Sequence, residues 1–453
     1  MFDSKLDLPS PAMGMSAPRE ASAGALAWFG LAVLVIVAFF ANIDRQILVL
    51  LTEPIRQDFG LSDLQIGLLQ GAGLALFAGA AALPIGWIAD RVDRRLVLAV
   101  CILVWSAATA TCGLTTGFWQ LFIASIGLGI GEAGLMPIIY GMIPDLFPAR
   151  QRVLANSVFA LVNLLGAGAG MALGGALLQG VTTMHGTLPG ALAGFSPWRL
   201  AFFAVAIPAP LLVILVAMIR PKHGDGSTNI RATEHVATSP LTARVYFTRE
   251  RAMMAKFFGA IALVNMAFTG ITTWMPIVAV RSFGAAPAAA GGGLGAAATI
   301  GSVFGCVLGW LIARRLSPRF GVLAPLRVCE WGALAAALTS VGYLTATSVT
   351  FVYSLFGLQF ACIVAGMVLF PAIMQSICPA HLRSRVAAIG VLTTIVVQAG
   401  SPVFIGVMSD RLQAVNHGLL LAIIGVALVG FSSACVLMRA AGKGVREAIE
   451  CYA

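Results

Sequence analysis

Long apolar runs dominate this sequence and restrict its fold more than any other feature. About twelve runs of roughly 20 apolar residues alternate with short polar loops, and a helix of that length crosses a bilayer. Because the bilayer core offers no hydrogen-bond partners, a spanning backbone must form either helices or a closed barrel. The runs are too long for barrel strands, which alternate over roughly 10 residues. The chain is therefore predicted to be an all-α membrane protein.

Composition agrees with lipid as the main solvent. Hydrophobic residues make up 59% of the chain and charged residues 10%, with a mean hydropathy of +0.94. A soluble domain needs more charge to cover its surface. The predicted spans are 27–52, 64–89, 96–115, 118–143, 153–180, 199–219, 253–280, 288–313, 322–346, 350–377, 386–408 and 418–438.

One long polar stretch, which begins at Pro221, separates six predicted spans from six. Short sequence similarities support two related halves, because residues 86–91 resemble 309–314 and residues 150–155 resemble 383–388. Residues 243–258 are expected to form a short surface helix. The predicted organisation is a disordered tail (1–24), an N-terminal six-helix bundle (25–220), a linker (221–251), a C-terminal six-helix bundle (252–439) and a second tail (440–453).

The positive charges are distributed unevenly along the chain. Of the 28 Lys and Arg, 23 fall on the side of the two tails and the even-numbered loops, whereas Arg56, Arg199, Arg281 and Arg411 fall on the other side and Arg45 lies inside a span. This asymmetry follows the positive-inside rule and predicts that the linker, both tails and both termini are cytoplasmic. The net charge of +10 therefore reports topology, and no nucleic-acid partner is expected.

The first predicted span holds two adjacent charges, Asp44 and Arg45, in the sequence NIDR. A charge near the bilayer centre costs about 3 kcal/mol, so each needs a partner. Neighbouring side chains on a helix point roughly 100° apart, so at least one of the two must reach another helix or a watery cavity. The alternative is that the pair lies at the outer interface and extends to water.

Glu132 lies in the fourth predicted span, in the glycine-rich sequence GLGIGEAG. It lies about 14 residues, roughly 20 Å, from the outer end of its helix and so near mid-depth. It is either an ion-coupling carboxylate or a structural brace that pairs with Arg45. Glu330, near Arg327 at the end of span nine, is expected to form a surface ion pair instead.

Further candidates are polar or large apolar side chains within the spans. The residues predicted to contact a substrate are Arg45, Asn42, Gln70, Met136, Tyr140, Asn265, Trp274, Gln359 and Phe370. No nucleophile–base pair, nucleotide-binding motif or metal-ligand spacing is found, so no enzyme activity, cofactor or metal is predicted.

Residues 86–95, GWIADRVDRR, resemble the motif that the major facilitator superfamily carries between its second and third helices. Asp93 stands where that family usually has Gly. The resemblance implies twelve transmembrane helices in two pseudo-symmetric six-helix bundles and a cavity lined by spans one, four, seven and ten. It also implies a conformational latch, formed by Gly86, Asp90, Arg91, Arg94 and Arg95, in which Asp90 faces the start of span eleven.

Within that superfamily, residues 42–46, 61–69 and 129–133 resemble the spinster family, and its bacterial members most of all. That resemblance implies proton-coupled transport of lysophospholipids or sphingoid lipids, with Asp44 and Glu132 as protonation sites and Arg45 as their partner or a substrate anchor. Many relatives have Arg seven residues before the glutamate of span four, where this chain has Ser125. We expect a monomeric transporter of the bacterial inner membrane that works by alternating access on an amphiphilic substrate. The alternatives are a passive facilitator or a small-molecule exporter.

Overall fold

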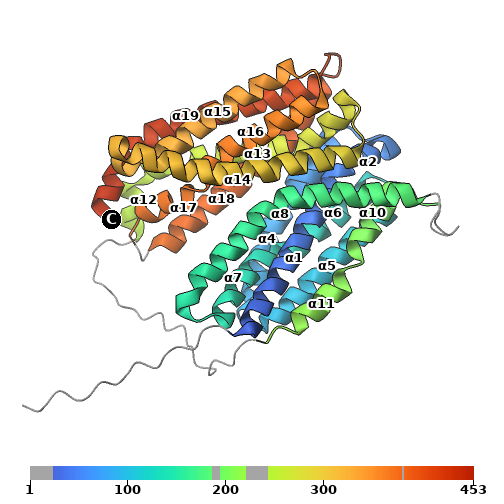
Figure 1. Cartoon of the computed structure of the whole chain (residues 1–453), viewed down its shortest axis with the longest axis horizontal. Coiled ribbons are helices and arrows are strands. Elements are labelled where there is room, and N and C mark those ends of the chain that lie inside the picture. Colours follow the sequence, from blue (N-terminus) through green and yellow to red (C-terminus); the bar gives the residue numbers. More distant parts are fainter. Residues whose placement is uncertain (1–23, 186–193, 221–242, 380–381, 453) are drawn as a thin grey trace, which may run out of the picture.

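A computed structural model describes residues 24–185, 194–220, 243–379 and 382–452. Within these residues all regular elements are helices, and they form two bundles that lie side by side (Figure 1). The predicted tail at 1–24 and the linker lie almost entirely outside the described residues. We call the end at which α11 ends and α12 begins the linker end, and the end that carries α2 the opposite end.

The N-terminal bundle contains six spans, three of which are divided into shorter elements. Its elements are α1 (Ala25–Leu50), α2 (Thr52–Phe59), α3 (Asp63–Gly67), the π-helical η1 (Leu68–Ala72), α4 (Gly73–Ala89), α5 (Arg94–Leu114), α6 (Phe118–Ala133), α7 (Leu135–Leu146), α8 (Ala149–Met184), α10 (Pro197–Ala206) and α11 (Ala209–Ala217). The second span consists of α3, η1 and α4, the fourth of α6 and α7, and the sixth of α10 and α11.

The C-terminal bundle also contains six spans. Its elements are α12 (Ala243–Arg249), α13 (Arg251–Phe283), α14 (Pro287–Phe320), η3 (Gly321–Leu323), α15 (Ala324–Gly342), η4 (Tyr343–Thr345), α16 (Val349–Met367), α17 (Phe370–Ser376), α18 (Arg383–Arg411) and α19 (Gly418–Tyr452). Eleven continuous stretches of the described residues are long and apolar enough to cross a membrane, and one of them, Pro287–Thr345, contains both α14 and α15. The predicted fold of twelve helices in two bundles is therefore confirmed.

The helices extend further than the apolar runs. The tail expected at 440–453 continues α19 as a helix to Tyr452. Ala441, Val445 and Ala448 are buried on one face of this extension, and the hydroxyl of Tyr452 lies 3.3 Å from Oε1 of Glu250. An apolar face at helical spacing thus keeps the chain helical past the point where hydropathy falls.

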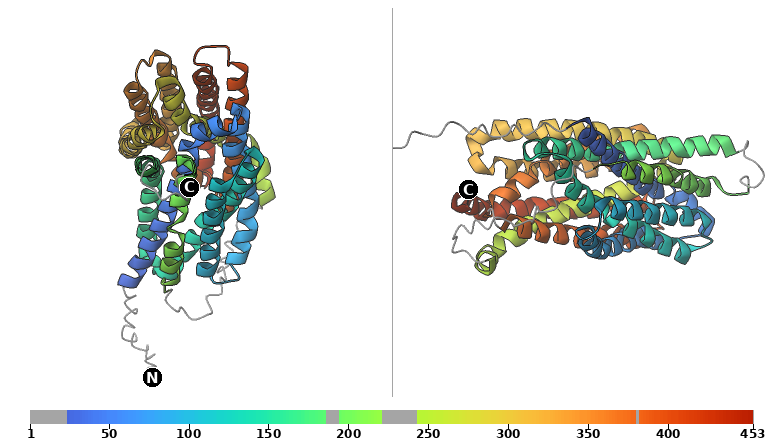
Figure 2. Two further views of the ribbon diagram at one scale, coloured as in Figure 1. Left: turned by 90° about the vertical axis from the view of Figure 1, so that its right-hand side faces the viewer. Right: turned by 90° about the horizontal axis from the view of Figure 1, so that it is seen from below.

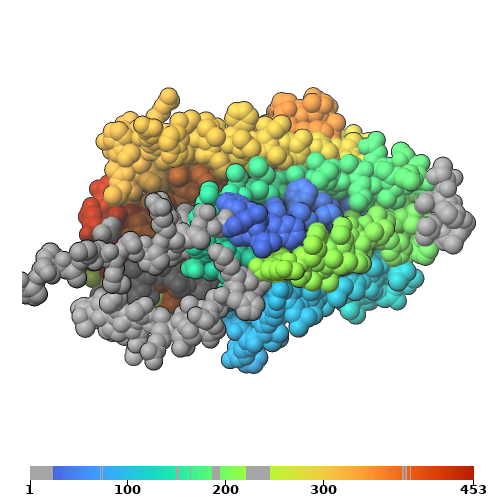
Figure 3. All heavy atoms as spheres, turned by 60° about the horizontal axis from the view of Figure 1, so that its bottom comes forward, coloured from blue at the N-terminus to red at the C-terminus, as the bar shows by residue number. Residues whose placement is uncertain are grey.

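Small residues bring the two bundles into contact. A Cβ atom added to Gly175 of α8 would lie 2.6 Å from the carbonyl oxygen of Ala288 in α14, so only glycine permits this approach. Figure 2 shows α8 running along α14, and Figure 3 shows α1 between α8 and α11 on the surface of the N-terminal bundle.

The bundles separate toward the linker end. A Cβ on Gly71 of η1 would lie 2.7 Å from the carbonyl oxygen of Ala399 in α18. On Gly79 of α4 it would lie 3.7 Å from Ile395, and on Gly86 it would have no neighbour within 4 Å among the described residues. The second span therefore packs tightly on α18 at the opposite end and departs from it beyond η1.

Candidate functional site

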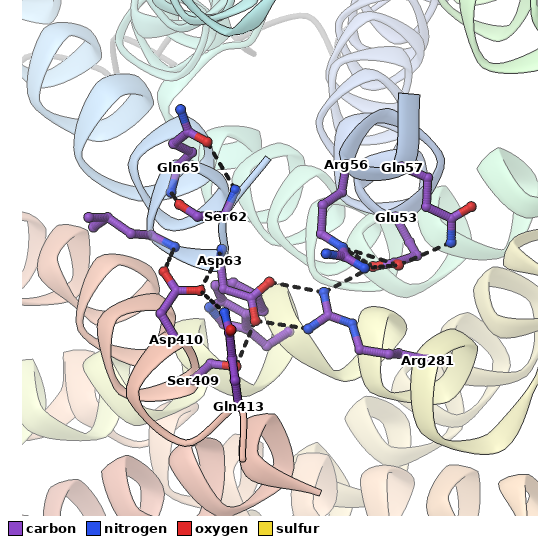
Figure 4. Close-up of polar contacts among 12 residues, drawn as sticks. Glu53, Arg56, Gln57, Ser62, Asp63, Gln65, Arg281, Ser409, Asp410 and Gln413 are labelled. Atoms are coloured by element: carbon purple, nitrogen blue, oxygen red, sulfur yellow. Dashed lines mark hydrogen bonds and ion pairs between the residues drawn. The ribbon is translucent and has the colours of Figure 1, made fainter. Parts of the chain in front are cut away.

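Charged residues from both bundles meet at the opposite end (Figure 4). Arg281, in the last turns of α13, donates from Nη1 to Oδ2 of Asp63 at 2.8 Å and from Nη2 to Oε2 of Glu53 at 3.0 Å. Glu53 belongs to α2 and Asp63 begins α3, so both carboxylates come from the N-terminal bundle. We call Glu53, Asp63, Arg281, Ser409 and Asp410 the bridging cluster.

The end of α18 completes the bridging cluster. Ser409 donates to Oδ2 of Asp63 at 2.6 Å, and the two carboxylate oxygens of Asp410 accept from the backbone N–H groups of Asp63 and Leu64 at 3.0 and 2.9 Å. An anion at the first N–H groups of a helix is favourable, so Asp410 caps α3 from the other bundle. The bundles are thus held together at the opposite end by ion pairs and by a helix cap.

Glu53 lies in α2, outside the spans, and two arginines act on it. Burial alone would raise the pKa of its carboxyl, but hydrogen bonds from Arg56 and the charge and hydrogen bond of Arg281 outweigh burial and hold the pKa below its ordinary value. Arg56 and Arg281 together therefore favour the ionised form of this carboxylate.

The adjacent charges Asp44 and Arg45 find partners on different helices. Arg45 donates from Nη2 and Nε to Oε2 of Glu132 in α6 at 2.6 and 3.2 Å. Asp44 instead accepts from the hydroxyl of Thr109 in α5, at 3.0 Å for Oδ1 and 2.7 Å for Oδ2. Because neighbouring side chains on a helix point in different directions, the two charges reach two different helices, α5 and α6.

Glu132 and Arg45 differ in their access to solvent. The side chain of Glu132 is 3% exposed, whereas that of Arg45 is 57% exposed. Oε1 of Glu132 is buried and has no hydrogen-bond partner among the described residues. Arg45 therefore joins a buried carboxylate to an accessible cavity.

Arg45 lines a polar cavity of about 270 Å³, which lies between the bridging cluster and the linker end. Its other polar walls are Gln46, Gln70, Thr269, Thr272, Thr273 and Gln398. The side chain of Gln70, carried by the π-helical segment η1, donates to the hydroxyl of Thr52. Irregular helix of this kind often occurs at functional sites.

A second cavity, of about 410 Å³, lies within the C-terminal bundle. Its walls come from α13, α15, α16, α17, α18 and α19, and most are apolar, including Phe257, Ile261, Met367, Phe370 and Met374. Asn265, Thr394 and Gln398 are its polar side chains. Gln398 also lines the polar cavity, so the two cavities meet at this residue.

The predicted substrate-contact residues fall into two groups. Arg45 and Gln70 line the polar cavity, and Asn265 and Phe370 line the apolar cavity. The amide of Asn42 is used elsewhere, because it donates to Asn163 of α8 at 3.2 Å.

The structure does not bring the remaining four to either cavity. Trp274 is buried, with Nε1 3.3 Å from the carbonyl oxygen of Pro402. Gln359 is buried among α15 and α16 and donates to Ser340 at 2.7 Å. Tyr140 packs its ring on Phe159, and Met136 packs against the core of the N-terminal bundle. The side chains of Trp274, Gln359 and Met136 thus pack against neighbouring helices, whereas Tyr140 contacts Phe159 and stays 46% exposed.

Glu330 and Ser125, two residues noted in the sequence, have defined surroundings in the structure. Glu330 does pair with Arg327, but it is only 4% exposed, so the expected surface location is wrong because α19 covers it, with Arg439 4.0 Å away. Ser125 is buried and its hydroxyl bonds to the carbonyl of Phe122. Among the described residues, no group of three His, Cys, Asp or Glu side chains could hold a metal ion.

The motif at residues 86–95 ties together the linker ends of the N-terminal helices. Arg94 donates to Asp145 and to the carbonyl oxygen of Gly141, both at 2.8 Å, and Arg95 donates to the carbonyl oxygen of Ile219 at 2.8 Å. The guanidinium of Arg91 stacks on Trp87. Asp90 pairs with Arg94 at 3.5 Å, and within the described part of the chain no hydrogen bond or ion pair joins its side chain to α18.

Sequence reasoning missed Thr109 and most of the bridging cluster. A threonine in an apolar span carries no signal that it faces a carboxylate. Arg281 did give a signal, because it is one of four basic residues on the side that is poor in positive charge.

Comparison with known proteins gives the family. The model of the Major Facilitator Superfamily matches residues 34–400 of this chain. The chain belongs to the Major Facilitator Superfamily. Members of this superfamily are transporters, and the all-helical architecture with two bundles agrees with that assignment.

Its relatives include spinster proteins, as the sequence resemblance indicates. The sphingosine-1-phosphate transporter SPNS2 of Mus musculus is 27% identical over 393 residues, which cover 82% of this chain and 68% of the relative. An MFS-type efflux pump of Mycolicibacterium smegmatis is 27% identical over 421 residues, covering 89% and 91%.

A solved structure has the same fold. It is a bacterial homologue of the human lysosomal transporter spinster in an inward-facing and occupied conformation, and it matches with a TM-score of 0.73 and 22% identity. The match covers 92% of this chain and 96% of that one.

Proposed function

We propose that this superfamily member is a proton-coupled secondary transporter that moves a single-chain amphiphile with an anionic head group. The observation that carries the proposal is the meeting of two unlike cavities at Gln398. Arg45 places an accessible positive charge in the polar cavity, and the apolar cavity lies next to it in the C-terminal bundle.

The dimensions and chemistry of the cavities support this substrate class. An apolar cavity of about 410 Å³ falls within the range that holds small ligands. A guanidinium binds phosphate or carboxylate through two parallel hydrogen bonds. The name of the Mus musculus relative, a sphingosine-1-phosphate transporter, gives a molecule of this class.

The proposed coupling lies in the competition for Arg45. An anionic head group that binds Arg45 draws its charge away from Glu132, and a buried carboxylate that loses its cation favours its neutral form. Glu132 then takes up a proton as substrate binds and releases it as substrate leaves. Asp44, which does not use Arg45 as a hydrogen-bond partner, is the second protonation site.

We assign the linker end to the cytoplasm and the protein to the bacterial inner membrane, as a monomer. The positive-inside asymmetry supports this orientation. In this orientation, the bridging cluster closes the outer side while the cavities face the cytoplasm. Labelling of a cysteine introduced at Gly226 by an impermeant reagent should occur from the cytoplasmic side alone.

Transport into proteoliposomes tests the function. The probes are radiolabelled lysophosphatidylglycerol, which is anionic, and lysophosphatidylcholine, which is zwitterionic, each with and without an imposed pH gradient. We expect the anionic lipid to accumulate against its own gradient only when the pH gradient is present. Equilibration without accumulation would indicate a passive facilitator.

The name of the Mycolicibacterium smegmatis relative makes a small-molecule exporter the second candidate. The apolar cavity is the feature that favours it, because a hydrophobic drug needs no anchor for an anion. Movement of an apolar cationic dye, with no movement of either lysolipid, would select this alternative.

A further inference from the structure

The hydroxyl of Thr109 lies between two acceptors. Oγ1 is 2.7 and 3.0 Å from the two carboxylate oxygens of Asp44, and 3.0 Å from the backbone carbonyl oxygen of Trp105. Thr109 is 0% exposed and Asp44 is 2% exposed, so water does not replace these contacts. A hydroxyl has one hydrogen to donate and two lone pairs that accept, so at any moment it donates to one of the two acceptors only.

We propose that Thr109 is a positioning residue of the coupling site, and that its hydroxyl reverses its hydrogen bond when Asp44 changes protonation state. With Asp44 ionised, Thr109 donates to the carboxylate. When Asp44 is protonated, its new O–H donates to Oγ1 of Thr109, and the hydroxyl hydrogen of Thr109 turns to the carbonyl oxygen of Trp105. This inference rests on the proposed role of Asp44 as a protonation site.

The need for such a residue follows from the burial of Asp44. A buried polar group that lacks a hydrogen-bond partner is destabilising, so a carboxyl that cycles between charged and neutral forms needs a partner for each form. A fixed donor, such as a backbone N–H, would satisfy the charged form alone. A hydroxyl serves both because it can donate or accept.

The other groups around Asp44 leave this role to Thr109. The titratable groups that act on Asp44 are Glu132 of α6, Arg45 of α1 and Cys112 of α5. Arg45 is engaged with Glu132. The helix α8, which also packs against α1, presents the uncharged Asn163 to Asn42.

Infrared difference spectroscopy of the purified full-length protein across a pH titration tests this directly. The C=O stretching band of neutral Asp44 is identified by its loss in Asp44→Asn. In Thr109→Val the band should move to higher frequency, because the carboxyl loses its acceptor. Its titration midpoint should rise by about one pH unit, because the lost hydrogen bond is stronger to the charged form than to the neutral one.

Two controls separate this role from a packing role. Thr109→Ser keeps the hydroxyl and should restore the band and its midpoint. Thr111→Val, on the exposed face of the same helix, should leave both unchanged. If Thr109→Val does not fold, Thr109→Cys, a weaker donor, should shift the band and midpoint in the same direction by less.

Two results would overturn the inference: an unchanged band and midpoint when the hydroxyl is removed, or an Asp44 that stays ionised throughout the titration. Failure of the proposed function looks different. In that case the band follows the expected pattern while pH-driven uptake of lysophosphatidylglycerol is absent.

Discussion

Arg45 contacts both a buried carboxylate and the polar cavity. It holds Glu132 at 2.6 Å, yet more than half of its side chain is accessible. The polar cavity and the apolar cavity contain no other Lys or Arg among their described walls. An incoming anion therefore has one cation to bind, and it must compete with Glu132 for it.

Replacement of Arg45 should accordingly weaken binding of anionic amphiphiles more than binding of zwitterionic ones. A hydrogen bond to a charged group contributes about 1.5–3 kcal/mol, so Arg45→Ala should raise the Kd for lysophosphatidylglycerol by roughly ten-fold or more. Isothermal titration of both lysolipids measures the difference. Arg314→Ala, which removes an exposed arginine of α14 outside both cavities, is the matched control and should change neither Kd. Equal losses for both lipids in Arg45→Ala would argue against a head-group anchor.

For single residues, the sequence identifies the charged side chains in the spans but not the helix face on which an uncharged side chain lies. Asp44, Arg45 and Glu132 stand out because ionised groups are costly in apolar spans. Thr109 and Gln359 are uncharged, and hydropathy reports neither the face on which a side chain lies nor its partner. Their roles follow from packing between helices and could not be predicted from the sequence.

Short elements at the ends of the long spans join the two bundles at the opposite end. The helix α2 supplies Glu53 and the start of α3 supplies Asp63, while Ser62 and Gln65 form a capping box that fixes where α3 begins. The backbone N–H groups of Asp63 and Leu64 at that point donate to the carboxylate oxygens of Asp410. The first turn of α3 thus supplies the N–H groups through which Asp410 joins the two bundles.

Removal of the cation from the bridging cluster should open the opposite end. Arg281→Gln leaves Glu53 and Asp63 buried without the guanidinium that pairs with both from the other bundle, and breaking such a pair costs several kcal/mol. Double electron–electron resonance between labels at Thr116 and Ala414 should show a longer distance and a broader distribution. Arg199→Gln, which removes an arginine that does not reach the other bundle, is the control. A distance distribution identical to that of the wild type would contradict the role of the cluster.

The bridging cluster should also give the opposite end a defined response to acid. The pKa of Glu53 in the closed state lies below its ordinary value, so its contribution is present above the ordinary range and is lost as pH falls through the lowered value. The same label pair should keep a constant distance from pH 8 down to about 4.3, the ordinary glutamate value, and lengthen only below it. Lengthening near neutral pH would exclude Glu53 as the group responsible.

At the scale of the whole molecule, the fold follows from the number and length of apolar runs. Twelve such runs divided by one polar stretch predict the two bundles, and residues 86–95 predict the superfamily. Boundaries are less predictable, because α14 and α19 continue as helices through segments that hydropathy treats as loops or tails. Contact between α8 and α14 depends on glycines whose partners lie in the other half.

Asp90 should hold the linker ends of the two bundles together in the conformation that is closed at the linker end. In this structure its side chain is 73% exposed and pairs weakly with Arg94. A carboxylate beside a helix N-terminus gains about 0.3–1 kcal/mol, and the start of α18 is the expected partner. Asp90→Asn should therefore shift the population toward the state that is open at the linker end. Labels on the linker ends of α4 and α18 would report this, and an unchanged distance distribution would rule out the latch.

Proton coupling through two buried carboxylates is the central claim, and it is tested by comparing binding with driven uptake in the same purified proteins. Wild type, Asp44→Asn and Glu132→Gln are each assayed for lysophosphatidylglycerol binding, thermal stability and uptake driven by a pH gradient. The coupling role predicts that both variants bind lipid and keep their thermal stability within a few degrees, yet lose uptake driven by the gradient. Full proton-dependent uptake in both variants would contradict it, and so would loss of stability with uptake that still responds to pH, since that is the result expected of a structural brace.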